Sequence, residues 1–256
     1  QRCVELKIRD AEQAGVGLEG ENKERFNKIA RELSQLSTDF SNHVLDATKA
    51  YELIIRDQSE TEGWPTSLRQ VAAQSYAQAN EGSEASPDEG PWRITLDFPS
   101  FMPFMQHHRV RTQREAIYRA YVGCASSGEW DNSPLIDRIL TLRKEQSTLL
   151  GFSCYADRSL ASKMAPDTAA VEQMIAELKS ASDGPMRADF AEMEALAREN
   201  GQETPLLHWD TGFWSERLRE ARFDYTDDQL RPYFPLPKVL DGLFGLSERL
   251  FGIQIE

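Results

Sequence analysis

Apolar residues recur at every third or fourth position along most of the chain, and this spacing is typical of one face of an α-helix. The longest such run covers residues 21–51 and predicts one amphipathic helix. Residues 3–14 predict a shorter helix before it, ended by the glycine-rich stretch GVGLEG. The apolar stripe of the long helix consists of Phe26, Ile29, Ala30, Leu33, Leu36, Phe40, Val44, Ala47 and Tyr51.

Two short β-branched runs interrupt this helical pattern, YELIIRD at residues 51–57 and WRITLD at residues 92–97. Between them lie a further helix pattern and the acidic loop EGSEASPDEG. We expect the two runs to pair as antiparallel strands and to form the one sheet of the protein. The predicted fold class is therefore mainly α, with one short antiparallel strand pair.

Capping and proline signals mark the helices that follow. Pro166 and Pro185 are each expected to begin a helix, and Thr226 with Gln229 forms a capping box. Pro237 opens a last, strongly apolar helix. Because the sequence contains no internal repeat and no long flexible linker, we assign residues 1–256 to a single helical domain.

The composition is that of an ordinary globular protein, with 40% apolar and 28% charged residues. A net charge of −13 disfavours nucleic-acid and anionic-membrane partners, because both require clustered lysine and arginine. The three cysteines, Cys3, Cys124 and Cys154, have no metal-binding spacing, which indicates a soluble protein of a reducing compartment. The chain begins at Gln1 and ends as abruptly, so we expect it to be a segment of a longer protein.

The histidines do not predict a metal site. His107 and His108 are adjacent, and neighbours on a helix point about 100° apart, whereas a two-ligand face needs a spacing of three or four. His43 lies one step off its apolar stripe, as expected of a hydrogen-bonded histidine at the edge of a core. The chain contains no HExxH, cysteine cluster, glycine-rich phosphate loop or G-x-S-x-G motif. From the residues alone we therefore expect no catalytic site.

Large aromatic and charged residues gather at residues 208–236. This pattern favours an aromatic packing joint between helices, and it also fits one wall of a peptide-binding cleft, because aromatic and arginine side chains recognise peptide backbone and carboxylates. The candidate substrate-channel residues are Trp209, Asp210, Trp214, Arg222, Tyr225 and Tyr233.

Several blocks of the chain resemble the thimet oligopeptidase / oligopeptidase A family of zinc metallopeptidases, most closely its plant organellar branch. The last block is FWSERLREARFDYTDDQLRPYFPLPKVLDGLFGLSERLFGI. Earlier blocks are GPWRITLDFPSFMPFMQHHRVRTQREAIYRAY and LEGENKERFNKIARELSQLSTDFSNHVLDATKAYELIIRD. The resemblance covers essentially the whole chain in matching order. One departure is Gly63-Trp64-Pro65, where the family usually has Gly-Leu-Pro.

The resemblance implies a two-lobed, nearly all-helical peptidase whose channel admits short unstructured peptides. The family holds its zinc with HExxH and a glutamate on a following helix, and this equipment lies beyond Glu256. We therefore expect the chain to be a non-catalytic helical lobe with a hinge region, inactive alone and without zinc, in a zinc-containing parent. A chloroplast or mitochondrion is the expected compartment, with the cytoplasm as an alternative.

The last apolar helix, near residues 239–251, is expected to contact a catalytic lobe, because it is too apolar to face water. Gly242 and Gly245 would allow close helix approach at a cost of about 1 kcal/mol each relative to alanine. Two alternatives stay open. The chain could be an inactive scaffold or peptide-binding subunit of a larger assembly, or it could belong to a split enzyme completed by a separate zinc-bearing chain.

Overall fold

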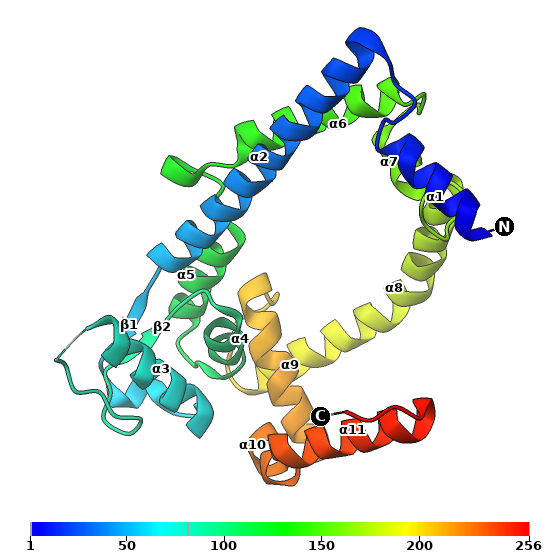
Figure 1. Ribbon diagram of the computed structural model, residues 1–256. Helices are drawn as coiled ribbons and strands as arrows, with labels where there is room; N and C mark the ends of the chain where they lie inside the picture. The colour runs from blue at the N-terminus through cyan, green and yellow to red at the C-terminus, as the bar shows by residue number, and fades with distance from the viewer. Residues whose placement is uncertain (1, 81, 256) are drawn as a thin grey trace. The chain divides into compact units, whose positions relative to one another are not determined.

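The computed structural model describes residues 2–80 and 82–255, and helices dominate it (Figure 1). The predicted mainly-α fold class is thus confirmed. None of the described helices is long and apolar enough to cross a membrane. In chain order the helices are α1 (Arg2–Gln13), α2 (Gly20–Ala50), α3 (Thr66–Ala79), α4 (Phe98–His107), α5 (Arg111–Val122), α6 (Ser133–Leu149), α7 (Tyr155–Leu160), α8 (Thr168–Glu199), α9 (His208–Phe223), α10 (Asp227–Leu230) and α11 (Leu236–Phe251).

The described residues contain one sheet, made of β1 (Leu53–Ile55) and β2 (Trp92–Ile94). The strands are antiparallel, with Leu53 opposite Ile94 and Ile55 opposite Trp92. The predicted strand pair is therefore confirmed, although each strand is shorter than the run that predicted it. Trp92 and Ile94 are fully buried, and α3 packs against β2. A two-stranded sheet is marginally stable in water by itself, and packing against this helix stabilises it.

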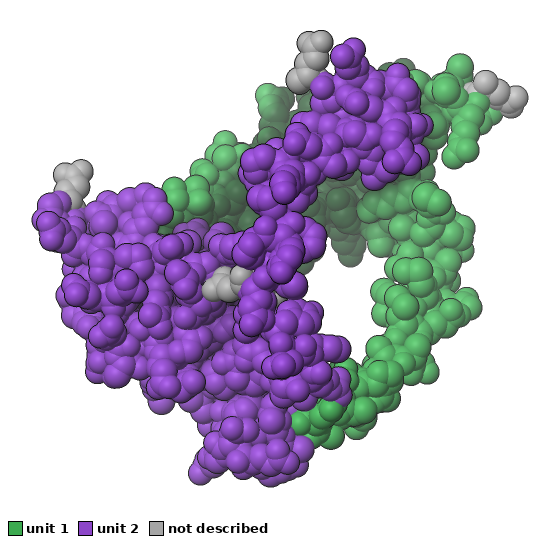
Figure 2. All heavy atoms as spheres, turned by 90° about the horizontal axis from the view of Figure 1, so that it is seen from below, with its two compact units in different colours: residues 1–51, 119–192 green, residues 52–118, 193–256 purple. Residues whose placement is uncertain are grey.

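The chain divides into two compact units, coloured separately in Figure 2. Unit 1 consists of residues 1–51 and 119–192, and unit 2 consists of residues 52–118 and 193–256. Two of the unit boundaries fall inside helices α5 and α8, so no linker sequence marks them. The assignment of all 256 residues to one domain of a larger protein stays a prediction.

Unit 1 is organised by the long helix α2, which packs against α6. Arg25 of α2 forms a two-bond ion pair with Glu145 of α6, at 2.5 Å for each bond. His43 hydrogen-bonds through Nδ1 to Asn132 Oδ1 at 2.9 Å, so the predicted role of His43 as a satisfied boundary histidine is confirmed. Polar pairs of this kind help to hold α2 against α6 and the residue before it, because in the apolar stripe of α2 only Phe26 and Ile29 are buried.

One helix start predicted from proline is wrong. Pro185 lies inside the continuous helix α8 rather than at the beginning of a second helix. A proline in a helix leaves the carbonyl four residues earlier without its N–H partner, here that of Ala181. Both residues are exposed, so water can satisfy that carbonyl and the helix continues.

Unit 2 has its core around the sheet, α4 and α9, and a polar relay runs through it. Trp64 donates from Nε1 to Nδ1 of His108 at 3.1 Å, and Nε2 of His108 lies 2.6 Å from Gln113 Oε1. Gln113 in turn donates to Glu60 Oε2 at 2.7 Å. These partners require a neutral His108 that carries its proton on Nε2. Trp64, of the stretch Gly63-Trp64-Pro65, therefore supplies the first donor of this hydrogen-bonded chain.

The relay predicts that unit 2 loses stability in mild acid. His108 is fully buried, stacks on Phe104 with 4.2 Å between ring centroids, and burial lowers its pKa to about 4. In the unfolded chain its pKa is 6.5, so below that pH the unfolded state binds the extra proton first. We expect up to about 3 kcal/mol of unfolding free energy to be lost between pH 6.5 and pH 4.

Urea titrations at several pH values would measure this loss. His108→Gln should flatten the pH dependence of the unfolding free energy in this window, and His208→Gln, at an exposed histidine, is the matched comparison. Equal slopes for the two variants would show that His108 is not the titrating group.

Candidate functional site

The candidate site is built at the start of α9, where Asp210 lies fully buried among arginines of α5. Arg111 donates to the carboxylate from Nε at 3.0 Å and from Nη2 at 2.7 Å, and Arg114 donates from Nη2 at 3.0 Å. The backbone N–H of Leu207 donates to Asp210 Oδ2 at 3.0 Å, which caps the first turn of α9. The carboxylate therefore ties α5 to α9.

Arg114 is as buried as Asp210, with a relative exposure of 0%. Its other donors reach the backbone carbonyls of His108 at 2.8 Å, Arg109 at 3.1 Å and Trp209 at 3.2 Å. Burial lowers the pKa of Arg114, and the hydrogen bond to Asp210 opposes that shift. Burial also raises the pKa of Asp210, but hydrogen bonds from Arg111, the Leu207 N–H and Arg114 outweigh it, so the net shift is downward. Both groups are therefore ionised near neutral pH.

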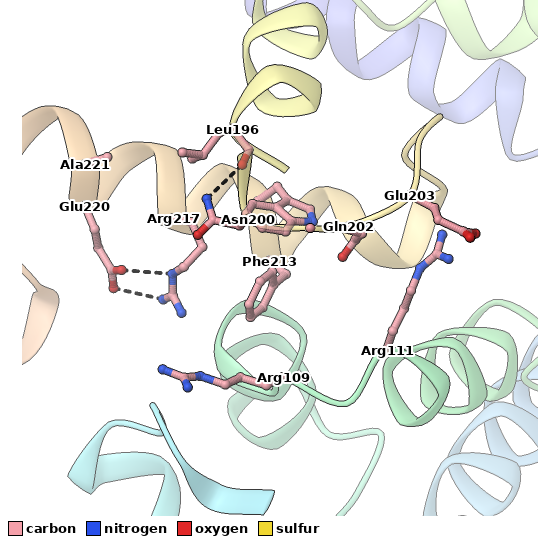
Figure 3. A pocket seen from close by; sticks show the side chains of 12 residues that line it. Arg109, Arg111, Leu196, Asn200, Gln202, Glu203, Phe213, Arg217, Glu220 and Ala221 are labelled. Atoms are coloured by element: carbon pink, nitrogen blue, oxygen red, sulfur yellow. Dashed lines mark hydrogen bonds and ion pairs between the residues drawn. The ribbon is translucent and has the colours of Figure 1, made fainter. Parts of the chain in front are cut away.

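Beside this network lies an open cavity of about 970 Å³. Arg217 and Glu220 lie side by side on α9 in its lining and form a two-contact ion pair, while Arg109 enters from the segment that joins α4 to α5 and Arg111 enters from the start of α5 (Figure 3). The indole Nε1 of Trp214 and Nε2 of Gln202 are buried and have no hydrogen-bond partner among the described residues. The lining is completed by Leu196, Asn200, Gly201, Glu203, Phe213 and Ala221.

The sequence-predicted site residues fall into two groups. Trp209, Asp210 and Trp214 are buried at the start of α9, with exposures of 9%, 0% and 5%. Of these, Trp214 lines the cavity. Packing explains the burial of Trp214, which joins Met193, Ala197 and Phe213 in a hydrophobic cluster.

The other three candidates are exposed. Tyr225 is 37% exposed and lies under the guanidinium of Arg219, 5.2 Å from its ring centroid. Tyr233 is 78% exposed, and Arg222 is exposed on α9. These three do not line the 970 Å³ cavity. The channel role of all six residues stays a prediction.

One group of potential metal ligands lies between α4 and α9. One ligand atom from each of His107, Glu216 and Glu220 falls within 4.8 Å of the others. Arginines already bind all three groups. Arg219 binds Glu216 at 2.5 and 3.1 Å, and Arg217 donates to both His107 Nδ1 and Glu220. The cluster therefore does not fit zinc as it stands, since a metal ion would have to displace two guanidinium groups.

Sequence reasoning missed Arg111 and Arg114 as parts of this site. A signal was present: positions 111, 114 and 118 share a helix face with the buried Ile117 beside them. An arginine on such a face indicates a buried partner carboxylate. Gln202 carried no comparable signal, because its burial depends on the loop between α8 and α9.

Sequence comparisons identify proteins that are similar to this chain. Residues 104–256 match the sequence model of Peptidase family M3. The chain is 48% identical over its whole length to the probable cytosolic oligopeptidase A of Arabidopsis thaliana, covering 36% of that protein. It is also 48% identical to the chloroplastic/mitochondrial organellar oligopeptidase A of the same plant, covering 32% of it.

A bacterial relative, oligopeptidase A of Escherichia coli (strain K12), is 36% identical over an alignment of 258 positions that covers 99% of this chain and 37% of the relative. The chain thus spans about a third of the length of these curated relatives. The match of the family model covers more than half of the chain and includes α5, α9 and the whole arginine–Asp210 network. The chain therefore belongs to peptidase family M3.

Proposed function

We propose that this chain is a non-catalytic part of a zinc metallo-oligopeptidase and forms one wall of the channel that admits short peptides. The observation that carries the proposal is the 48% identity, over the full chain, to two proteins named oligopeptidase A. The printed sequence contains no HExxH motif, so the chemistry of peptide hydrolysis would come from outside these residues.

Zinc in this proposal belongs to the parent protein. The cluster of His107, Glu216 and Glu220 is already neutralised by Arg217 and Arg219, so it does not offer the open ligand set of a catalytic zinc site. We therefore assign no catalytic step to any residue of this chain.

The channel-wall role is supported by the chemistry of unit 2. The 970 Å³ cavity combines arginines with unpartnered buried donors on Trp214 and Gln202, which suit peptide carbonyls and carboxylates. The exposed aromatic side chains of Tyr225 and Tyr233 offer further contact area for a peptide.

Helix α11 has no buried residue in the described structure, and we propose that a catalytic lobe covers it. A chloroplast or mitochondrion suits the similarity to the organellar relative, while the equally similar cytosolic relative supports the cytoplasm. An inactive peptide-binding subunit is the competing function, because the sequence lacks HExxH.

The test compares the 256-residue chain with a longer protein that restores the downstream sequence of its gene. We expect the chain alone to bind no stoichiometric zinc and to leave a fluorogenic short peptide uncleaved, whereas the longer protein should bind zinc and cleave the peptide. Elemental analysis and fluorescence would measure these two properties.

Two results would contradict the proposal. One zinc per isolated chain, lost in Glu216→Gln but kept in the exposed Glu177→Gln, would place a metal at the His107 cluster. A longer protein that binds peptide without zinc or hydrolysis would favour the inactive subunit.

A further inference from the structure

Unit 1 contains a second cavity, of about 370 Å³, whose lining is basic. Arg143 of α6, Arg158 of α7 and Lys163 just after α7 contribute three positive charges. None of the described aspartates or glutamates lines it. This concentration of positive charge stands out in a chain whose net charge is −13.

These three cations have no carboxylate partner among the described residues, unlike other cations of the same unit. Arg25 and Arg138, for comparison, each form an ion pair at 2.5 Å with a glutamate. The acidic residue of α7, Asp157, accepts instead from the Ser153 hydroxyl and the Cys154 thiol. The positive charge of the cavity is therefore not compensated by neighbouring acids.

Neutral partners hold the cations in place. Arg158 donates to the side-chain oxygen of Gln146 and to the backbone carbonyl of Gln13. Arg143 lies over the ring of Tyr155, 4.8 Å from its centroid, and Lys163 Nζ donates to the Ser159 hydroxyl at 2.8 Å. Because neutral partners position the charges without cancelling them, the cavity is organised before any ligand enters.

The half-burial of Arg158 also favours the binding of an anion in this cavity. Burial lowers the pKa of Arg158, and no carboxylate among the described residues counteracts the shift. A partly buried charge without a counter-ion is costly, and an anion that enters the cavity would remove this cost. A partly buried guanidinium without a counter-ion does not stabilise the fold, but it favours the binding of an anion.

We propose that this cavity binds a phosphate group, either as the free ion or as part of a small phosphorylated molecule. Arginine forks and a lysine ammonium are the usual cationic partners of phosphate, and a doubly charged oxyanion matches three uncompensated cations better than a single carboxylate does. Ser159 in the same lining accepts from Lys163 and keeps its hydroxyl proton for a phosphate oxygen, whereas Ser37 and Ser162 donate to the backbone carbonyls of Leu33 and Ser159.

The cavity is larger than one phosphate ion needs, and its remaining wall is partly apolar. Leu33 and Tyr155 lie in the lining beside the cations. A small organic group attached to the phosphate could pack there. An inorganic phosphate probe and a phenyl phosphate probe therefore distinguish the two sources of the same chemistry.

The test is titration of the full 256-residue chain at constant ionic strength with inorganic phosphate, phenyl phosphate or acetate. Isothermal calorimetry gives the Kd and thermal unfolding gives the accompanying rise in Tm. We expect phosphate to bind more tightly than acetate. We expect Arg143→Gln combined with Lys163→Gln to raise the phosphate Kd at least about tenfold. Lys179→Gln, at an exposed lysine of α8 in the same unit, should leave it unchanged.

The double variant keeps Arg158 and its bonds to Gln146 and Gln13, and its circular dichroism should match that of the unchanged chain. Tighter binding of phenyl phosphate would identify a phosphorylated molecule as the source, and equal or weaker binding would identify the free ion. The proposal fails if acetate binds as tightly as phosphate, or if the double variant and Lys179→Gln respond alike.

Discussion

Replacing Asp210 by asparagine is expected to lower the unfolding free energy of the protein by about 3–5 kcal/mol. The substitution keeps the shape of the side chain and removes its charge. Arg114, with 0% exposure, would then remain buried without a counter-ion, and Arg111 would lose a partner at 2.7 Å. An uncompensated buried charge is one of the few causes of destabilisation on this scale.

The size of this effect depends on burial, and an exposed ion pair provides the control. Asp183 pairs with Arg187 on the surface of α8 at 3.1 Å, and Asp183→Asn should cost less than about 1 kcal/mol. Urea denaturation would measure both variants. If Asp210→Asn prevents folding altogether, Arg111→Gln gives a milder change, because that guanidinium is 35% exposed. Equal losses for Asp210→Asn and Asp183→Asn would show that the buried network does not stabilise unit 2.

A double-mutant cycle would measure the interaction free energy between Arg114 and Asp210 separately from their other contacts. Arg114→Met removes the buried charge that Asp210 neutralises, so adding Asp210→Asn to Arg114→Met should cost less than Asp210→Asn alone. Purely additive losses would mean that the two side chains act independently, contrary to their 3.0 Å contact.

The regular elements could be predicted where a local pattern alone determines them. The apolar stripe of residues 21–51 predicted a helix that the structure gives as Gly20–Ala50, because many turns repeat the same spacing. The strand pair was predictable from β-branched runs, although packing against α3 sets the length of the strands. Pro185 misled the prediction, because a solvent-exposed helix tolerates the carbonyl that a proline leaves without a partner.

The site was less predictable, because its chemistry depends on residues far apart in the sequence. Asp210 was selected as a possible channel residue, but its partners Arg111 and Arg114 lie 99 and 96 positions earlier in the chain. The basic cavity of unit 1 likewise combines Gln13 and Ser37 with residues near position 160. The spacing of apolar residues does not predict contacts between distant segments, and a net charge of −13 does not predict a local excess of positive charge.

The isolated chain is expected to bind hydrophobic dye and to self-associate through α11. On this helix Leu243 is 54% exposed and Phe251 is 73% exposed, and Leu240 and Phe244 are 37% and 38% exposed. Full burial of one leucine or phenylalanine side chain is worth about 1.5–3 kcal/mol, so several of them on one face favour a partner strongly. Gly242 and Gly245 strengthen this inference. An added Cβ would meet no atom within 4 Å at either position, which leaves room for another helix to approach closely.

Dye fluorescence and light scattering would measure this property in the 256-residue chain and in a longer protein with the downstream sequence restored. We expect high signals for the first and low signals for the second, because the proposed catalytic lobe would cover the helix. Leu243→Ser with Phe251→Ser should reduce both signals in the isolated chain, whereas Val4→Ser, at an exposed apolar position of α1, should have little effect.

Gly245→Ala should leave the isolated chain folded but weaken the packing of the proposed catalytic lobe on α11 in the longer protein, since the added methyl group occupies the space that an approaching helix would use. An isolated chain that stays monomeric and binds no dye would remove the physical support for a covering lobe, and the inactive peptide-binding subunit would then become the favoured function.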